Sequence, residues 1–215
     1  MRTAAFLGLV LSLTLSASAA AMPDHLSKPQ YIAPQDTIPA PQDIAYPGTM
    51  QLEVDARDHD QGIFRITQTI PVAKAGPLTL LYPEWLPGNH APRGEIEKLT
   101  GLEFTAGGQT LAWVRDNVDV FAFHLTVPEG VSQITATFQF VSATMENQGR
   151  IVMAPSMLNL RWHQVSLYPA GYYVRQIPVQ ATALYPDGWQ AASALRPKST
   201  SGNSVVYEKT DYDTL

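Results

Sequence analysis

One short segment of the chain concentrates the residue types that could do chemistry. It runs from Tyr82 to Gly94 and reads Tyr-Pro-Glu-Trp-Leu-Pro-Gly-Asn-His-Ala-Pro-Arg-Gly. Its prolines stiffen the backbone and its glycines allow tight turns, so the segment should present Trp85, His90 and Arg93 together. A rigid aromatic and cationic loop suits recognition of a carboxylate or a peptide backbone. The alternative is a structural corner in which Trp85 fills the core, and the residues alone leave both interpretations open.

Histidine and cysteine chemistry finds little support elsewhere in the sequence. The five histidines are His25, His59, His90, His124 and His163, and none belongs to an H-E-x-x-H helix or another familiar metal-ligand spacing. His124 alternates with phenylalanines and should face outward on a strand. We expect surface or packing roles for all five. The chain has no cysteine, which excludes disulfides, thiolate nucleophiles and cysteine-based metal sites.

The acidic motifs are better explained by ordinary structure than by catalysis. The run Asp58–Gly62 resembles the start of a calcium loop but lacks the later ligands, so a solvated hairpin turn is expected. Glu95 and Glu97 lie two residues apart, and a solvated acidic turn is the simpler interpretation. The Met145–Asn147 match to an aminopeptidase M-E-N motif is attributed to chance. Serine-hydrolase elbows and phosphate-binding glycine loops are absent from the sequence.

Composition favours an all-β globular protein. The chain has 215 residues, of which 45% are hydrophobic and 15% charged, enough to bury a sizeable core. Lys and Arg total 14 against 19 Asp and Glu, for a net charge of −5. This balance, with no basic stripe, argues against nucleic acid as a partner. The 17 prolines and 14 glycines are spread along the chain, which suits short strands joined by turns.

The N-terminal residues resemble a secretory signal. Arg2 precedes an apolar run over residues 4–15, which is too short to span a membrane, and small-x-small cleavage patterns end at Ala19 and Ala21. We therefore predict a signal peptide over 1–21, export to the bacterial periplasm or medium, and no membrane association after cleavage. Residues 22–48 are proline-rich and predict an extended leader, partly ordered at best.

Strand patterns recur from Thr49 onward. Residues 50–70 predict a hairpin around the 58–62 turn, and residues 102–114 predict a second hairpin with a Gly107-Gly108 turn. Alternating apolar residues mark further strands at 121–126 and 134–140. Additional strands are expected at 78–82, 174–184 and 204–207, and residues 96–99 could form one helical turn. The sequence thus predicts an all-β, antiparallel β-sandwich-like domain of about eight or more short strands over 49–215.

The segment from Tyr82 to Gly94 also resembles part of a known protein family. Residues 85–93 resemble the W-x-P-G-S-Y-x-x-R signature of the glycyl aminopeptidase family of zinc metallopeptidases, in which a PDZ domain often follows the catalytic domain. Asn89 and His90 depart from the usual Ser and Tyr. Other similar stretches follow in the family's order, namely residues 102–114, 119–127, 177–189 and 207–215.

The resemblance implies a non-catalytic N-terminal β domain. In that family a thermolysin-like domain follows, with an H-E-x-x-H motif and a downstream Glu that bind zinc, and it removes small N-terminal residues. Those residues are absent here, so this chain should contain no catalytic or metal residue and should be inactive alone. The zinc, the catalytic domain and the peptide substrate would belong to a parent chain, before whose catalytic domain the sequence stops.

The resemblance also assigns expectations to the loop. Trp85, Pro87, Gly88, Asn89, His90 and Arg93 are expected at the substrate cleft or the domain interface. Trp85 would supply apolar packing, and Arg93 would pair with a carboxylate of the substrate or of the catalytic domain. Pro87 and Gly88 would fix the turn. His90 would alter substrate preference if the family's tyrosine shapes the cleft.

The competing hypothesis is a free-standing periplasmic β-sandwich module that binds peptide or glycan. Tyr168, Tyr172 and Tyr173 could form its binding platform, although ordinary strand packing also explains them. An H-E-x-x-H motif in the sequence that follows Leu215 would favour the peptidase domain over the binding module.

Overall fold

The computed structural model describes residues 31, 33, 36–86, 88 and 90–215. The predicted signal peptide over 1–21 and the first leader residues lie outside the described residues. The described residues from 36 to 215 belong to one compact unit. Every described helix is a single 3-10 turn, and none of the described helices is long and apolar enough to cross a bilayer.

The described elements are almost entirely short strands. The strands are β1 (Met50–Asp55), β2 (Ile63–Pro71), β3 (Gly76–Leu81), β4 (Leu99–Ala106), β5 (Gln109–Leu111), β6 (Trp113–Arg115), β7 (Ala122–Val127), β8 (Gln133–Val141), β9 (Met153–Ala154), β10 (Met157–Leu158), β11 (Tyr168–Pro169), β12 (Pro178–Leu184), β13 (Pro197–Ser201), β14 (Ser204–Tyr207) and β15 (Thr210–Asp211). The 3-10 turns are η1 (His59–Gln61), η2 (Ile96–Lys98), η3 (Glu146–Gln148), η4 (Trp162–Gln164) and η5 (Val174–Gln176). The all-β prediction is confirmed.

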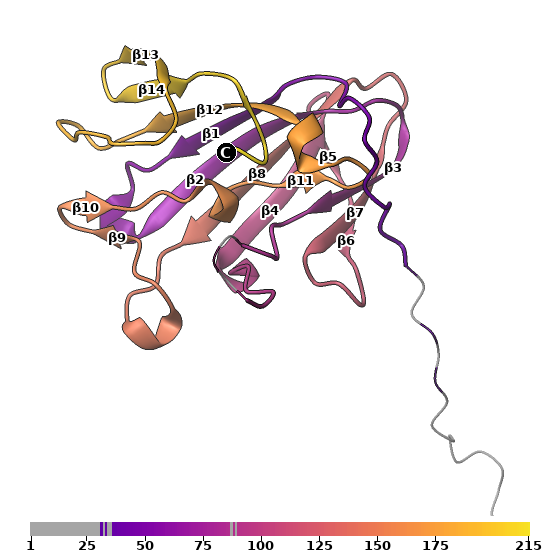
Figure 1. The fold of residues 1–215 in the computed structure, drawn as a ribbon, viewed down its shortest axis with the longest axis horizontal. Helices are drawn as coiled ribbons and strands as arrows, with labels where there is room; N and C mark the ends of the chain where they lie inside the picture. The colour runs from indigo at the N-terminus through magenta and orange to yellow at the C-terminus, as the bar shows by residue number, and fades with distance from the viewer. Residues whose placement is uncertain (1–30, 32, 34–35, 87, 89) are drawn as a thin grey trace, which may run out of the picture. The chain divides into compact units, whose positions relative to one another are not determined.

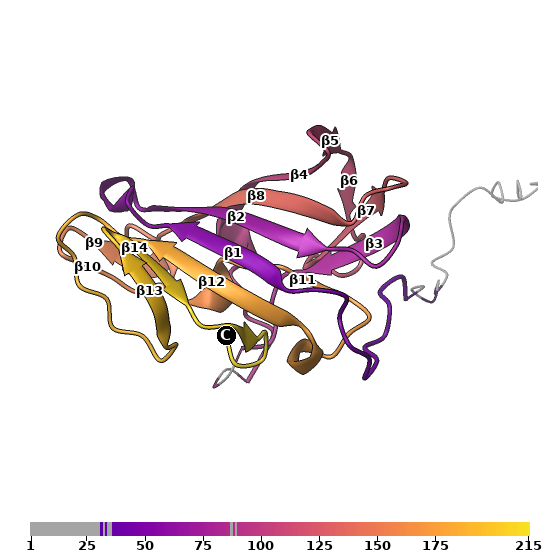
Figure 2. The ribbon, with the colours of Figure 1, turned by 90° about the horizontal axis from the view of Figure 1, so that it is seen from above.

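Two main sheets hold the fold together. The large sheet has nine strands in the order β13-β14-β12-β1-β2-β8-β4-β5, with β15 paired to β12. The small sheet has the order β11-β3-β7-β6, and β9 and β10 form a separate hairpin. Figures 1 and 2 show β1, β2 and β12 running side by side, with β13 and β14 at one edge of the large sheet.

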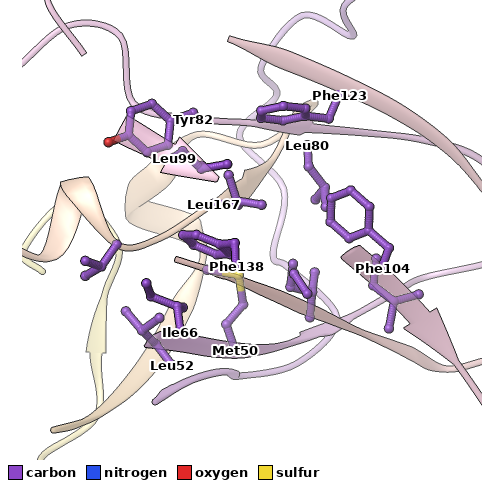
Figure 3. Close-up of a cluster of buried hydrophobic side chains, with 14 of the residues drawn as sticks. Met50, Leu52, Ile66, Leu80, Tyr82, Leu99, Phe104, Phe123, Phe138 and Leu167 are labelled. Atoms are coloured by element: carbon purple, nitrogen blue, oxygen red, sulfur yellow. The ribbon is translucent and has the colours of Figure 1, made fainter. Parts of the chain in front are cut away.

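The core lies between the two sheets, as strand alternation predicts. Ile134, Ala136, Phe138 and Phe140 of β8 are all buried, while their neighbours along the strand are more exposed. Figure 3 shows side chains of both sheets in one cluster, with Leu167 among them. Contacts between aromatic rings continue this packing, because Trp113 meets Phe104 of the large sheet and Phe123 of the small sheet edge-on.

Both predicted hairpins are present. Strands β1 and β2 pair antiparallel around η1, where an ion pair between Asp58 and Arg65 closes the turn. Strands β4 and β5 pair around Gly107 and Gly108, whose φ angles of 56° and 80° are the left-handed values that a tight two-residue turn requires. After β5 the chain changes sheets, because β6 pairs with β7 of the small sheet.

Two features differ from the antiparallel expectation. Strands β1 and β12 pair in parallel along their whole lengths, which is possible because the many elements between them provide the long return connection. The predicted strand over 174–184 begins only at Pro178, because residues 174–176 form the turn η5. Within η5, the backbone N–H groups of Gln176 and Ile177 bond locally to Tyr173 and Val174.

The described end of the leader is attached to the domain before β1 starts. Thr37 donates a hydrogen bond to Asp116, and Asp43 accepts bonds from Arg175 and Gln176. Tyr46 is buried, packs edge-on against Tyr172 and donates to the Pro71 carbonyl. Ordered contacts therefore begin about a dozen residues before the expected boundary at Thr49.

A buried glutamine connects the large sheet to the segment that leads into β11. Gln68 is fully buried on the core face of β2. Its Nε2 donates to the Leu167 carbonyl at 2.7 Å, and its Oε1 accepts from the Leu167 N–H at 2.9 Å. This one amide satisfies both backbone groups of a buried residue that lies outside every strand.

Replacing Gln68 with methionine tests this contact. Q68M keeps a long side chain but leaves two buried backbone groups without partners, so the free energy of unfolding should fall by about 3 kcal/mol. Urea denaturation measures the change. Gln51→Met on the exposed face of β1 is the matched control and should change stability by less than about 0.5 kcal/mol. Equal effects of the two variants would contradict the assigned role of Gln68.

The leader anchor predicts a pH dependence. Hydrogen bonds from Thr37, from the Asp119 N–H and from His124 hold the pKa of Asp116 well below its usual range. A lowered folded-state pKa stabilises the fold above the unfolded value of about 4 and loses that effect as the pH falls below it. Asp116→Asn should therefore lower the melting temperature at pH 7, and its difference from wild type should shrink below about pH 4. A constant difference from pH 7 to pH 3, measured by thermal melts, would argue against this anchor.

Candidate interface cleft beside the Tyr82–Gly94 loop

The base of the Tyr82–Gly94 loop is fixed by long-range hydrogen bonds. It follows β3, and the Tyr82 N–H donates to the Phe121 carbonyl at 2.9 Å. The buried Tyr82 hydroxyl donates to the Gln164 carbonyl at 3.1 Å. At the other side, the Glu84 carbonyl accepts the N–H groups of both Arg93 and Gly94 at 3.0 Å. The loop is therefore closed on itself and held to two distant segments.

Gly94 permits the closest approach in this loop. A Cβ atom built on Gly94 would lie 2.1 Å from the Pro83 carbonyl oxygen and 3.0 Å from the Phe121 ring. No side chain fits at that separation, so glycine is required to close the loop. Gly88 has a φ angle of 79°, a left-handed value, but a Cβ there would meet no atom within 4 Å. Gly94 is thus required because there is no space for a side chain, whereas Gly88 is favoured by its left-handed backbone conformation.

The tip of the loop exposes its aromatic side chain. Trp85 is 64% exposed, so it does not fill the core, and Leu86 is the buried apolar residue of this corner. His90 and Arg93 are also exposed, and Arg93 forms no salt bridge with any described residue. Pro87 and Asn89 lie outside the described residues.

Trp85 borders a cleft of about 360 Å³. Four parts of the chain line it, and its residues are Pro83, Glu84, Trp85, Leu86, His163, Ser166, Tyr168, Val174, Tyr212, Asp213 and Leu215. The loop contributes its first half, whereas His90 and Arg93 do not line the cleft. Sequence reasoning missed the wall at His163, Ser166 and Val174, because no local pattern connects that segment to the loop.

Four ionisable side chains of the cleft have pKa values shifted toward their neutral forms. Burial, and then the nearby Asp119, raises the pKa of Glu84. Burial, and then the Arg161 charge, lowers the pKa of His163. Burial also raises the pKa of Tyr168 and of Tyr212. Each shift has desolvation as its first cause, so the cleft is a poorly hydrated environment rather than a cluster of charges.

A polar cluster lies behind the His163 wall. Glu95 accepts hydrogen bonds from Lys98 and from Gln164, and the Lys98 side chain is only 9% exposed. The expectation of a solvated turn is therefore correct for Glu97, which is exposed. It is wrong for Glu95, because this carboxylate is hydrogen-bonded to the buried side chains of Lys98 and Gln164. His163 Nε2 and Gln164 Oε1 are buried without hydrogen-bond partners in the described part of the chain.

The remaining sequence candidates do not assemble into a site. No three His, Asp or Glu side chains among the described residues lie close enough to hold a metal ion, so the zinc that the resemblance implies has no ligand set there. His124 lies on the outward face of β7, where it bonds to Asp116 and Thr79.

The three tyrosines proposed as a platform each have a different partner. Tyr168 packs on Tyr212 and lines the cleft, whereas Tyr172 packs on Tyr46. Tyr173 is the exposed member and lies under the Arg175 guanidinium, 4.3 Å from it. The three rings are thus engaged separately.

Comparison of the sequence with models of protein families shows which family the chain belongs to. Residues 51–215 match the model of the Peptidase M61 N-terminal domain. The chain belongs to this family. The match covers all strands of the M61 N-terminal domain except the first residue of β1, and it includes the whole cleft. The resemblance to a peptidase N-terminal domain is thereby confirmed. No curated protein sequence matches the chain significantly.

One solved structure shows a similar fold within a larger protein. An aminopeptidase N family protein from Idiomarina loihiensis matches with a TM-score of 0.60 at 17% identity, over 78% of this chain and 28% of that one. Two other solved structures are more distant. Yeast LTA4 hydrolase matches with a TM-score of 0.38 at 9% identity, over 78% of this chain and 26% of that one. An M1 zinc metallopeptidase from Deinococcus radiodurans matches with a TM-score of 0.38 at 11% identity, over 79% of this chain and 38% of that one. The M61 N-terminal domain thus spans less than two fifths of each of these proteins.

The two loop glycines give a matched test of the loop geometry. Gly94→Ala places a methyl group against backbone and should destabilise the M61 N-terminal domain by about 3 kcal/mol or prevent folding. Gly88→Ala meets open space and should cost only about 1 kcal/mol for its left-handed backbone. Chemical denaturation of both variants measures the difference. A smaller cost for Gly94→Ala than for Gly88→Ala would refute the close approach to Pro83.

Proposed function

We propose that this chain is the non-catalytic N-terminal domain of an exported zinc aminopeptidase that removes small N-terminal residues. In this proposal the cleft beside Trp85 faces the catalytic domain and forms one wall of the substrate site. The observation that carries it is the 64% exposure of Trp85 at the rim of a cleft, in a domain whose family is a peptidase N-terminal domain.

The environment of the cleft supports an interface role. Tryptophan is enriched at protein interfaces, so an exposed indole at the rim of a cleft suits a surface that another domain covers. Burial raises the pKa of Glu84 and lowers that of His163, so both groups already lie in partly desolvated positions beside Trp85. Tyr212, Asp213 and Leu215 line the same cleft and add further apolar surface to it.

The proposal divides the chemistry between two domains. Zinc would be held by an H-E-x-x-H motif and a downstream Glu outside this chain, and it would activate the water that attacks the peptide. The residues of this chain would exclude water and orient the substrate. Arg93 forms no salt bridge within the described part of the chain and would pair with a carboxylate of the substrate or of the catalytic domain. Export to the periplasm rests on the predicted signal over 1–21.

Substitutions in the full-length peptidase test the proposal. Trp85→Ala removes the interdomain packing of an aromatic ring, worth about 2 kcal/mol, so kcat/KM for a glycyl substrate should fall roughly tenfold or more. Arg93→Ala should raise KM if Arg93 pairs with the substrate, or lower the melting temperature if it pairs with the other domain. Steady-state kinetics and thermal melts measure both effects.

The control for these variants is Val118→Ala. Val118 is 68% exposed and does not line the cleft, so both kinetics and melting should stay at the wild-type level. If Trp85→Ala and Arg93→Ala also leave kinetics and melting unchanged, the loop has no part in the substrate site or the interface.

A further inference from the structure

A second hollowed surface is lined in part by residues of β13 and β14. These strands lie at one edge of the large sheet (Figure 1). Two depressions of about 360 and 600 Å³ flank the segment from Trp189 to Ser193. They share that segment and Tyr185, so the segment divides two adjoining depressions. Both volumes lie in the range of small-molecule sites.

Aromatic rings in fixed positions line both depressions. Tyr185 and Trp189 belong to both, Trp162 to the first and Tyr207 to the second. The Trp189 ring lies 5.0 Å from the His59 ring, and the Tyr185 and Tyr207 hydroxyls are 2.8 Å apart. Trp162 meets Tyr207 edge-on at 5.6 Å. Tyr207 is itself buried, whereas Trp162, Tyr185 and Trp189 are partly exposed, so a ligand would meet these three rings already oriented by their contacts.

The polar groups of this surface are all neutral. Amides and hydroxyls line it, from Asn159, Gln190, Ser193, Thr200 and Asn203. No Asp, Glu, Lys, Arg or His side chain lines either depression, whereas the cleft beside Trp85 includes Glu84, His163 and Asp213. A charged ligand would lose hydration here and gain no opposite charge.

We propose that this surface binds a neutral oligosaccharide. A sugar ring has apolar C–H faces that pack on indole and phenol rings, and hydroxyls around its edge that pair with amides and hydroxyls. The lining offers both kinds of contact and no charge, and the two adjoining depressions suit consecutive sugar units. Asn203 Nδ2 donates to Asp187, which orients the amide at the rim. This site is separate from the peptidase cleft and does not depend on the proposed peptidase function.

Calorimetric titration of the full chain with maltotriose, cellotriose and triacetylchitotriose tests the proposal. At least one trisaccharide should bind with a dissociation constant of about 1 mM or tighter. Trp189→Ala should weaken that binding at least tenfold. Trp85→Ala removes the same side chain from the peptidase cleft and should change the saccharide affinity less than twofold.

A second variant keeps the test independent of folding. Ala192 is exposed on the divide between the depressions, so Ala192→Arg blocks both without removing a packed ring, and it should also abolish binding. The proposal is overturned if none of the three trisaccharides binds, or if Trp85→Ala weakens binding as much as Trp189→Ala. It is also overturned if acetyl-triglycine amide binds at the same residues as tightly as the saccharides do.

Discussion

One buried amide connects the large sheet to the segment that leads into the small sheet. Gln68 lies on the core face of β2 between Ile66 and Ile70, a position that alternation reserves for an apolar side chain. It is retained there because the Leu167 backbone crosses the core without a strand partner and needs both a donor and an acceptor. The same contact fixes the neighbouring residues Ser166 and Tyr168, which line the cleft opposite the Tyr82–Gly94 loop. This side of the cleft is therefore attached to the centre of the large sheet.

The wall of the cleft formed by the Tyr82–Gly94 loop is also attached to the segment before β11. The Tyr82 hydroxyl bonds to the Gln164 carbonyl, and Gln164 also donates to Glu95 just after the loop. Residues 164–167 therefore connect both walls through contacts that are far apart in sequence. A cleft built this way keeps its width as long as the core is intact, which is what a surface that positions a substrate or another domain requires.

Sequence patterns correctly predicted individual strands and turns, but they predicted little of how distant segments pair or pack. Alternation along 134–140 and the glycine pair at 107–108 correctly predicted a buried strand and a turn, because both signals come from adjacent residues. The parallel pairing of β1 with β12 has no local signature, since both strands show the same alternation in either direction. Within the site, the stiff 82–94 loop could be found from its prolines and glycines. His163 could not, because only the fold brings it to the loop.

The exposure of Trp85 contrasts with the rigidity of the loop that carries it. The Glu84 carbonyl accepts both N–H groups at the loop's return, and Gly94 packs against Pro83, so the backbone on both sides of Trp85 is fixed. Leu86 is the buried apolar side chain of this corner, whereas 64% of Trp85 is exposed. Under the proposed function this is a useful constraint, since a loop that is already ordered loses little backbone conformational freedom when another domain covers it.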